Sequence, residues 1–177
     1  MINPFSRSYT KDELRLFEFL HKNRLFGNLT RKELSEFLPH LYLRHYQQNE
    51  VIFFRNDPSQ ALYLIKTGTI ALKIDVNDNF ETFAHIKDNA SVGNNALIEK
   101  TKRIYSAIVE SEMAQLYVIP QVNILSIFDS HVKIKAKVFA SLAQIYNSNT
   151  TNLMKAYQAT SGFFDLSQMY KNLEYGG

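Results

Sequence analysis

The sequence contains no cysteine, which excludes disulfide bonds, thiolate catalysis and cysteine-ligated zinc. It also lacks a run of basic residues, and its 20 Lys and Arg against 17 Asp and Glu give a formal net charge of only +3. Such a mild balance does not by itself imply a nucleic-acid partner. No apolar stretch approaches the length of a membrane-spanning helix, and the N-terminus has no leader pattern. We therefore expect a cytoplasmic protein with no membrane attachment.

Catalytic and metal-binding patterns are also missing. The histidines show no metal-ligand spacing, and no nucleophile is paired with a base. We expect no metal, no cofactor and no enzymatic activity. The histidines concerned are His21, His40, His45, His85 and His131.

The N-terminal region carries two copies of one helix-start signal. Thr10 precedes Glu13 by three residues and Thr30 precedes Glu33 by three residues, which is the pattern of a capping box. Apolar residues follow each box at helical spacing. The first forty residues are therefore predicted to be helical, with an N-terminal helical segment assigned to residues 1–24.

From residue 42 the pattern changes to short runs of β-branched, aromatic and other apolar residues. Asn, Asp, Pro and Gly separate the runs, and residues 77–79 are predicted to form a hairpin turn. This spacing indicates an antiparallel roll over residues 25–128. The predicted strands are residues 51–54, 61–65, 69–74, 80–86, 105–109 and 114–119.

Helical periodicity returns after Pro120, and a long stretch from about 130 to 157 contains no Pro or Gly. Apolar residues recur there at coiled-coil spacing, with Asn149 as a polar residue that would set the register. The pattern predicts either a homodimer through this helix or a helix packed back on its own roll. The fold class is α+β, with residues 129–177 forming a long C-terminal helix and tail.

A glycine and small residues precede a short helix, and an arginine follows them in the chain. Gly93 and Ala96 would let backbone N–H groups approach an anion, and Arg103 supplies a charge with a forked set of donors. The segment is predicted to hold a small phosphorylated ligand. Alternatively, Asn94 and Asn95 cap the helix, and Arg103 is solvated with its charge answered by Glu99 or Glu110.

These motifs together resemble the cyclic nucleotide-binding domain of catabolite-activator-type regulators and cyclic-nucleotide-dependent kinases, over roughly residues 25 to 155. Residues 50–53 with Asp57 resemble the first turn of the family, and residues 62–68 resemble its Tyr-containing strand and Gly turn. The family's Gly-Glu-x-Ala-Leu and Arg-x-Ala-Thr/Ser segments align without a gap. The resemblance implies a ligand site made of Gly93, Asn94, Asn95, Ala96, Arg103, Tyr105 and Ser106, and a ligand such as cAMP or cGMP.

The sequence departs from the family pattern at three positions. Asn94 replaces the acid that binds the ribose hydroxyl, Lys102 replaces a proline, and Tyr105 replaces a small alanine. An amide oxygen still accepts a hydrogen bond, without an ionic contribution. The phenol of Tyr105 would either fill part of the ligand volume or contact a different ligand.

Two functions follow from the resemblance, and a third from the shape of the roll. The first is a ligand-sensing regulatory module in signal transduction. The second is a degenerate domain with a filled site that serves as a dimerisation scaffold, and the third is a small cupin-like enzyme, which would need clustered His and carboxylate ligands. About twenty residues follow Gln158, too few for the family's DNA-reading unit, so no DNA binding by that route is expected.

Overall fold

The computed structural model describes residues 8–76 and 79–161. Residues 77 and 78 of the turn predicted at 77–79, and the tail from residue 162, lie outside this range. The chain divides into two compact units, residues 1–142 and 143–177. The domain boundaries expected after residues 24 and 128 stay predictions.

Both predicted capping boxes are present, and they begin the N-terminal helices α1 (Lys11–Lys22) and α2 (Arg31–Ser35). Thr10 Oγ1 accepts from the Glu13 N–H at 3.2 Å, and Glu13 Oε2 accepts from the Thr10 N–H at 2.8 Å. Thr30 and Glu33 repeat this exchange. Each box satisfies two backbone donors that a helix start otherwise leaves without partners. The short 3₁₀ helix η1 (Leu38–His40) then leads into the sheets.

The described residues form eight strands in two antiparallel sheets, which confirms the predicted roll and the α+β class. One sheet has the order β1-β8-β3-β6 and the other the order β2-β7-β4-β5. Two strands were missed: β1, which is almost entirely exposed and so lacks an apolar pattern, and β6, which has two residues. The strands are β1 (Tyr42–Gln47), β2 (Val51–Phe53), β3 (Ala61–Thr67), β4 (Ile70–Val76), β5 (Asn79–Ile86), β6 (Ser91–Val92), β7 (Ser106–Val109) and β8 (Met113–Pro120).

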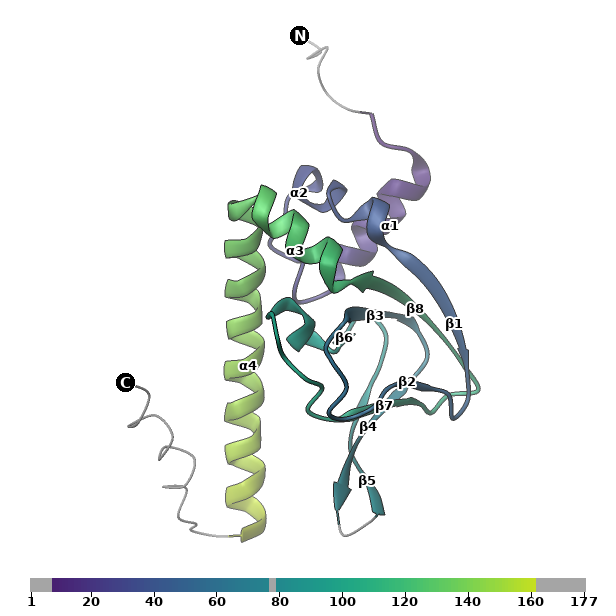
Figure 1. Cartoon of the computed structure of the whole chain (residues 1–177), viewed down its shortest axis with the longest axis vertical. Helices are drawn as coiled ribbons and strands as arrows, with labels where there is room; N and C mark the ends of the chain where they lie inside the picture. Colours follow the sequence, from purple (N-terminus) through teal and green to yellow (C-terminus); the bar gives the residue numbers. More distant parts are fainter. Residues whose placement is uncertain (1–7, 77–78, 162–177) are drawn as a thin grey trace, which may run out of the picture. The chain divides into compact units, whose positions relative to one another are not determined.

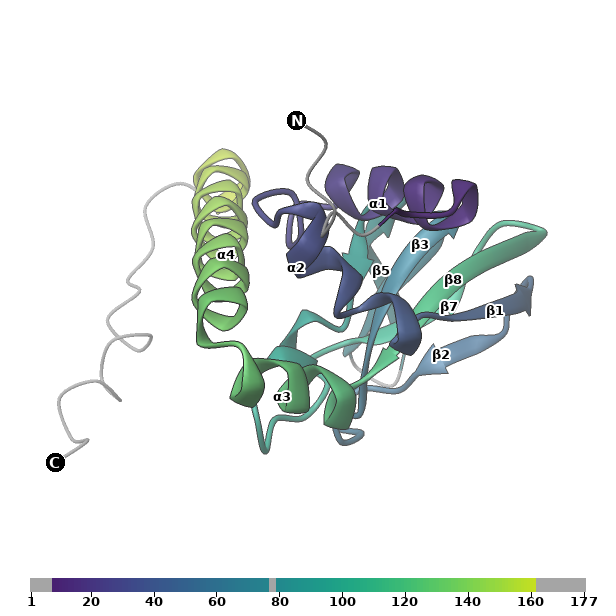
Figure 2. The same cartoon turned by 90° about the horizontal axis from the view of Figure 1, so that it is seen from above.

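Strand β3 separates two layers because successive side chains point to opposite faces of a sheet. Tyr63 and Ile65 join the cluster inside the roll. Leu64 faces outward with Tyr117, its register partner on β8, and the Tyr117 ring lies 5.2 Å from that of Phe19 on α1. Figure 2 shows α1 alongside this sheet. The interior cluster contains Ile52, Phe53, Ile65, Ile70, Leu72, Val92, Ala107, Val109, Ala114 and Leu116.

Two helices follow the roll, as predicted: α3 (Gln121–Ser130) and α4 (Val132–Ser161). The first turns of α4 belong to the first unit, where Lys137 Nζ lies 2.7 Å from Glu33 Oε2 and Phe139 contacts Phe128. In Figure 1 helices α1, α2 and α3 gather at one end of this unit, and the β4–β5 hairpin lies at the other.

The described part of the second unit is the remainder of α4, which ends at Ser161. Its side chains include exposed apolar groups, with Leu153 62% and Tyr146 38% accessible. Pairing of this helix with a second copy stays a prediction. Among the described residues, no helix has the length and apolarity needed to cross a bilayer.

Candidate anion-binding cradle

The cradle begins at Gly93, which joins β6 to the short 3₁₀ helix η2 (Asn94–Leu97). Its φ of 74° lies in the left-handed region, where a side chain adds strain. A Cβ at this position would also fall on Nη1 of Arg103. Gly93 is therefore needed both for the turn and for the close approach of the guanidinium.

The backbone of Arg103 is held by the turn after β2. The Arg103 N–H donates to the Asp57 carbonyl at 2.8 Å, and the Arg103 carbonyl accepts from the Asn56 N–H at 2.9 Å. Asn56 has φ of 70°, a conformation that asparagine tolerates better than most residues. Asp57 Oδ2 accepts from the Phe54 N–H at 2.9 Å and closes the turn. This anchoring directs the Arg103 side chain towards Gly93.

The guanidinium of Arg103 is buried, with 3% of the residue exposed. Its Nη1 donates to the Gly93 carbonyl at 3.0 Å and to Asn95 Oδ1 at 3.3 Å, and its Nη2 donates to the Ala61 carbonyl at 2.6 Å. The alternative of a solvated arginine is thus wrong. Glu110, one of its suggested partners, instead lies 2.7 Å from His85 Nδ1.

Arg103 has no carboxylate within ion-pair distance among the described residues. Its guanidinium carbon lies 4.2 Å from the ring centre of Phe53 and 5.7 Å from that of Tyr63, and its buried Nε has no hydrogen-bond partner within residues 8–76 and 79–161. Burial lowers the pKa of Arg103, against the opposing effects of Tyr63, Tyr105 and Asp57. The cation is therefore balanced by carbonyl dipoles and aromatic faces instead of a contacting anion.

Tyr105 lies in the same place. Its hydroxyl accepts from the Gly93 N–H at 3.4 Å, a long hydrogen bond. Its ring lies 5.9 Å from that of Phe53 and 5.8 Å from that of Phe83. Burial raises the pKa of Tyr105, which the Gly93 hydrogen bond and the Arg103 charge partly oppose. The Tyr105 hydroxyl is thus the hydrogen-bond partner of the Gly93 N–H, the first backbone donor of the cradle.

Helix η2 presents further donors. The N–H groups of Asn94 and Asn95 have no hydrogen-bond partner among the described residues, whereas the Ala96 N–H donates to the Gly93 carbonyl at 2.9 Å. No side chain caps this helix, so the alternative role of Asn94 and Asn95 as caps is wrong. Asn95 Nδ2 donates to the Lys102 carbonyl, and Asn94 Oδ1 is buried with no hydrogen-bond partner in the part of the chain that the structure describes.

The predicted site residues are thus mostly close to one another, with one facing elsewhere. Gly93, Asn95, Arg103 and Tyr105 are in contact, and Ala96 bonds back to Gly93. Ser106 is 1% exposed and its hydroxyl accepts from the Arg55 N–H at 2.9 Å, so it supports the turn after β2. Their role in ligand binding stays a prediction.

Sequence reasoning missed the aromatic surroundings of Arg103. Phe53 and Tyr63 are partners of the guanidinium, and Phe83 contacts Tyr105. The alternation along β3 could have placed Tyr63 inside the roll with Ala61 and Ile65. Phe83 gives no such signal, because the β4–β5 register shifts between its neighbours Thr82 and Ala84.

The family follows from a match of the sequence model described as the cyclic nucleotide-binding domain, which covers residues 43–131. The match covers half of the chain, and this protein belongs to that family. The matched range includes the whole cradle and α3. It also includes all eight described strands, apart from the first residue of β1. No curated protein sequence matches the chain.

Solved structures with the same fold agree. A cyclic nucleotide-binding domain from Methylobacillus flagellatus has a TM-score of 0.70 and 21% identity, covering 88% of this chain and 87% of its own. The catabolite activator protein of Thermus thermophilus has a TM-score of 0.64 and 23% identity, and the match covers 76% of this chain and 63% of that protein. The regulatory domain of Toxoplasma gondii PKA with cAMP has a TM-score of 0.62 and 15% identity, and the match covers 68% of this chain but only 46% of that one.

Proposed function

We propose that this protein is a non-enzymatic, ligand-sensing regulatory module in signal transduction. Its cradle binds a small phosphate-bearing ligand, with a cyclic nucleotide such as cAMP or cGMP as the first candidate. The observation that supports this most directly is the buried guanidinium of Arg103, which faces Gly93 and has no contacting carboxylate among the described residues. Burial of a charge without a counter-charge is costly, and an anionic ligand would remove that cost.

Two further features favour a ligand that carries both a phosphate and a ribose hydroxyl. The N–H groups of Asn94 and Asn95 have no described partner, so they are available as donors. The buried side-chain oxygen of Asn94, which no described residue contacts with a hydrogen bond, would accept one from a ribose hydroxyl. Charge-assisted hydrogen bonds from backbone N–H groups and a guanidinium are the usual means of phosphate recognition.

The proposed output is the long helix α4. It starts within the first unit, where Lys137 pairs with Glu33, and continues to Ser161. We propose that it pairs with the same helix of a second copy, and that no DNA is bound. A ligand shifts such a helix only through its different affinity for two states. Sedimentation velocity with and without cAMP would measure the dimer, and a monomer under both conditions would overturn this output.

A second function is favoured by Tyr105. Its hydroxyl accepts a hydrogen bond from the Gly93 N–H, and its ring contacts the rings of Phe53 and Phe83. If this arrangement is permanent, the phenol takes the place of a ligand. The protein would then be a degenerate domain that acts as a dimerisation or interaction scaffold. A cupin-like enzyme has no such support, because the described residues contain no group of three metal-ligating side chains.

Calorimetric titration with cAMP, cGMP and a cyclic dinucleotide separates the two functions. The chains to compare are the wild type, Arg103→Ala, Tyr105→Ala and the control Arg55→Ala, whose side chain is 41% exposed and lies 3.4 Å from Asp75. Binding by the wild type and by Arg55→Ala that is lost in Arg103→Ala supports the sensor. Binding only by Tyr105→Ala supports the filled scaffold, and binding by none of the chains rejects the sensor. Thermal melts identify any variant that has lost its fold.

A further inference from the structure

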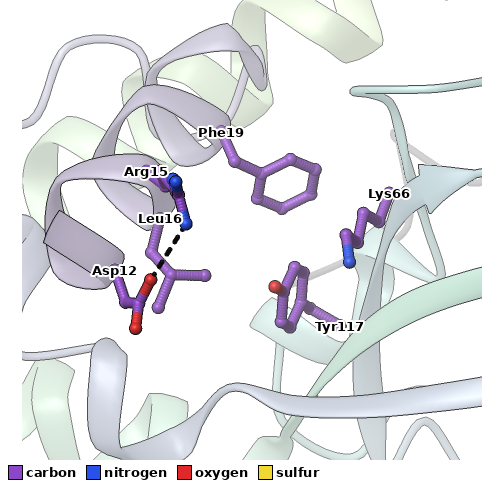
Figure 3. Close-up of a pocket in the computed structure, with 6 residues that line it drawn as sticks. All are labelled: Asp12, Arg15, Leu16, Phe19, Lys66 and Tyr117. Atoms are coloured by element: carbon purple, nitrogen blue, oxygen red, sulfur yellow. Dashed lines mark hydrogen bonds and ion pairs between the residues drawn. The ribbon is translucent and has the colours of Figure 1, made fainter.

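A second candidate site lies on the other face of the sheet from the cradle. A pocket of about 310 Å³ lies between α1 and strands β3 and β8. On β3, Tyr63 faces Arg103 inside the roll, whereas Lys66 lines this pocket, so the two sites share a strand but no side chain. Figure 3 shows its lining residues, which are Asp12, Arg15, Leu16, Phe19, Lys66 and Tyr117.

The walls of the pocket are apolar. Leu16 and Phe19 from α1 and Tyr117 from β8 form these walls (Figure 3), and the rings of Phe19 and Tyr117 contact each other, with their centres 5.2 Å apart and their planes tilted by 54°. These three side chains are each half-buried. Two aromatic rings and a leucine make a surface suited to a flat apolar group.

The polar groups around these walls are mainly donors. The Lys66 amine lies 5.9 Å from the ring centre of Tyr117 and pairs with no carboxylate among the described residues. The Tyr117 hydroxyl has no hydrogen-bond partner in the described part of the chain, and burial raises the pKa of Tyr117. Asp12 is the one carboxylate in the lining, and it lies 3.2 Å from Arg15 Nη1.

From these contacts we infer that the pocket binds a compact aromatic carboxylate. The aromatic body lies against Leu16, Phe19 and the ring of Tyr117, and the carboxylate accepts hydrogen bonds from Lys66 Nζ and the Tyr117 hydroxyl. The volume is at the small end of ligand pockets, which favours a one- or two-ring acid over a nucleotide. A carboxylate is favoured because, among the described residues, Lys66 and the phenol are donors without a hydrogen-bond acceptor, while Asp12 in the lining already has Arg15 beside it.

The test uses two probes of the same shape on the full chain. These are 2-naphthoate and 2-naphthalenemethanol, titrated while the amide signals are followed by nuclear magnetic resonance. The expected result is saturable binding of naphthoate with shifts at Phe19, Lys66 and Tyr117, about tenfold tighter than the neutral alcohol, because one charge-assisted hydrogen bond contributes about this factor.

Three variants sharpen the test. Lys66→Gln should weaken naphthoate about tenfold and leave the alcohol unchanged, since only the acid uses the amine. Tyr117→Phe should weaken naphthoate by a few-fold, whereas Lys73→Gln, a control on β4 of the other sheet, should change neither probe. Equal affinity for both probes, no loss in Lys66→Gln, or shifts at Gly93 and Arg103 in place of the pocket would overturn the inference. These readouts do not depend on whether the cradle binds a nucleotide.

Discussion

Lys137 and Arg103 are both cations held by long-range contacts, and their surroundings differ. Lys137 Nζ lies 2.7 Å from a carboxylate oxygen of Glu33, which also caps α2, and both side chains keep partial access to water. Arg103 is almost fully buried and contacts carbonyls, an amide oxygen and aromatic rings. In the helical region the lysine is paired with a carboxylate, whereas in the cradle the buried arginine has no contacting carboxylate among the described residues.

This difference separates a structural contact from a candidate functional one. A pair such as Lys137 and Glu33 is complete in itself, and its contribution is to join α4 to α2. A buried cation without a contacting anion is a less stable arrangement that a ligand could complete. The following changes test this contrast, in order of expected effect.

Gly93→Ala should have the largest effect. The left-handed φ of 74° adds strain, and the new Cβ would displace the Arg103 guanidinium from its carbonyl partners. We expect a loss of about 3 kcal/mol in the free energy of unfolding, measured by urea denaturation. Gly27→Ala is the control. The φ of Gly27 is not positive, and the atom nearest to an added Cβ would be the His21 carbonyl oxygen at 3.3 Å. Equal losses for the two variants would contradict the special geometry at Gly93.

Glu33→Gln tests the structural pair and its pH dependence. Burial alone raises the pKa of Glu33, but the hydrogen bonds from Lys137 and Thr30 outweigh it and lower the pKa below 4.5. The stabilisation is therefore present above pH 4.5 and is lost as the pH falls through the lower folded-state pKa. At pH 7 we expect the variant to lose about 1 kcal/mol. Urea denaturation from pH 7 to pH 3 should show this difference shrinking, and a difference independent of pH would reject the pair.

Tyr105→Phe should have a smaller effect on stability. The variant keeps the ring contacts with Phe53 and Phe83 but loses a hydrogen bond of 3.4 Å to the Gly93 N–H. We expect a loss of about 0.5 kcal/mol in the free energy of unfolding. Thermal denaturation would check it, with Tyr105→Ala as the comparison that also removes the ring. If the two variants unfold at the same temperature, the ring contacts contribute nothing.

Asp12→Asn should have the smallest effect. Asp12 and Arg15 lie 3.2 Å apart, but their side chains are 86% and 78% exposed. Water and salt screen such a pair, so no measurable change in the urea midpoint is expected. A loss of about the same free energy of unfolding as in Glu33→Gln would show that the exposed ion pair stabilises the fold as much as the pair between Lys137 and Glu33.

The fold could be predicted in large part because its signals are local. The capping boxes at Thr10 and Thr30 depend on residues three positions apart, and both are present. Strands such as β3 and β8 have long apolar runs, and the long helix contains no Pro or Gly. Strands β1 and β6 escaped prediction because they pair through the backbone without an apolar pattern of their own.

The sequence by itself determined the family and the antiparallel roll, and it predicted that Gly93 and Arg103 belong to one site, because these follow from spacing and residue type along the chain. Only the tertiary structure decided what surrounds them. Phe53, Tyr63 and Phe83 come from three different strands, and the Ala61 carbonyl is 42 positions from Arg103. The pocket beside Tyr117 likewise depends on α1 meeting β8 about 100 residues later. Such contacts depend on how strands and helices pack, which local periodicity does not encode.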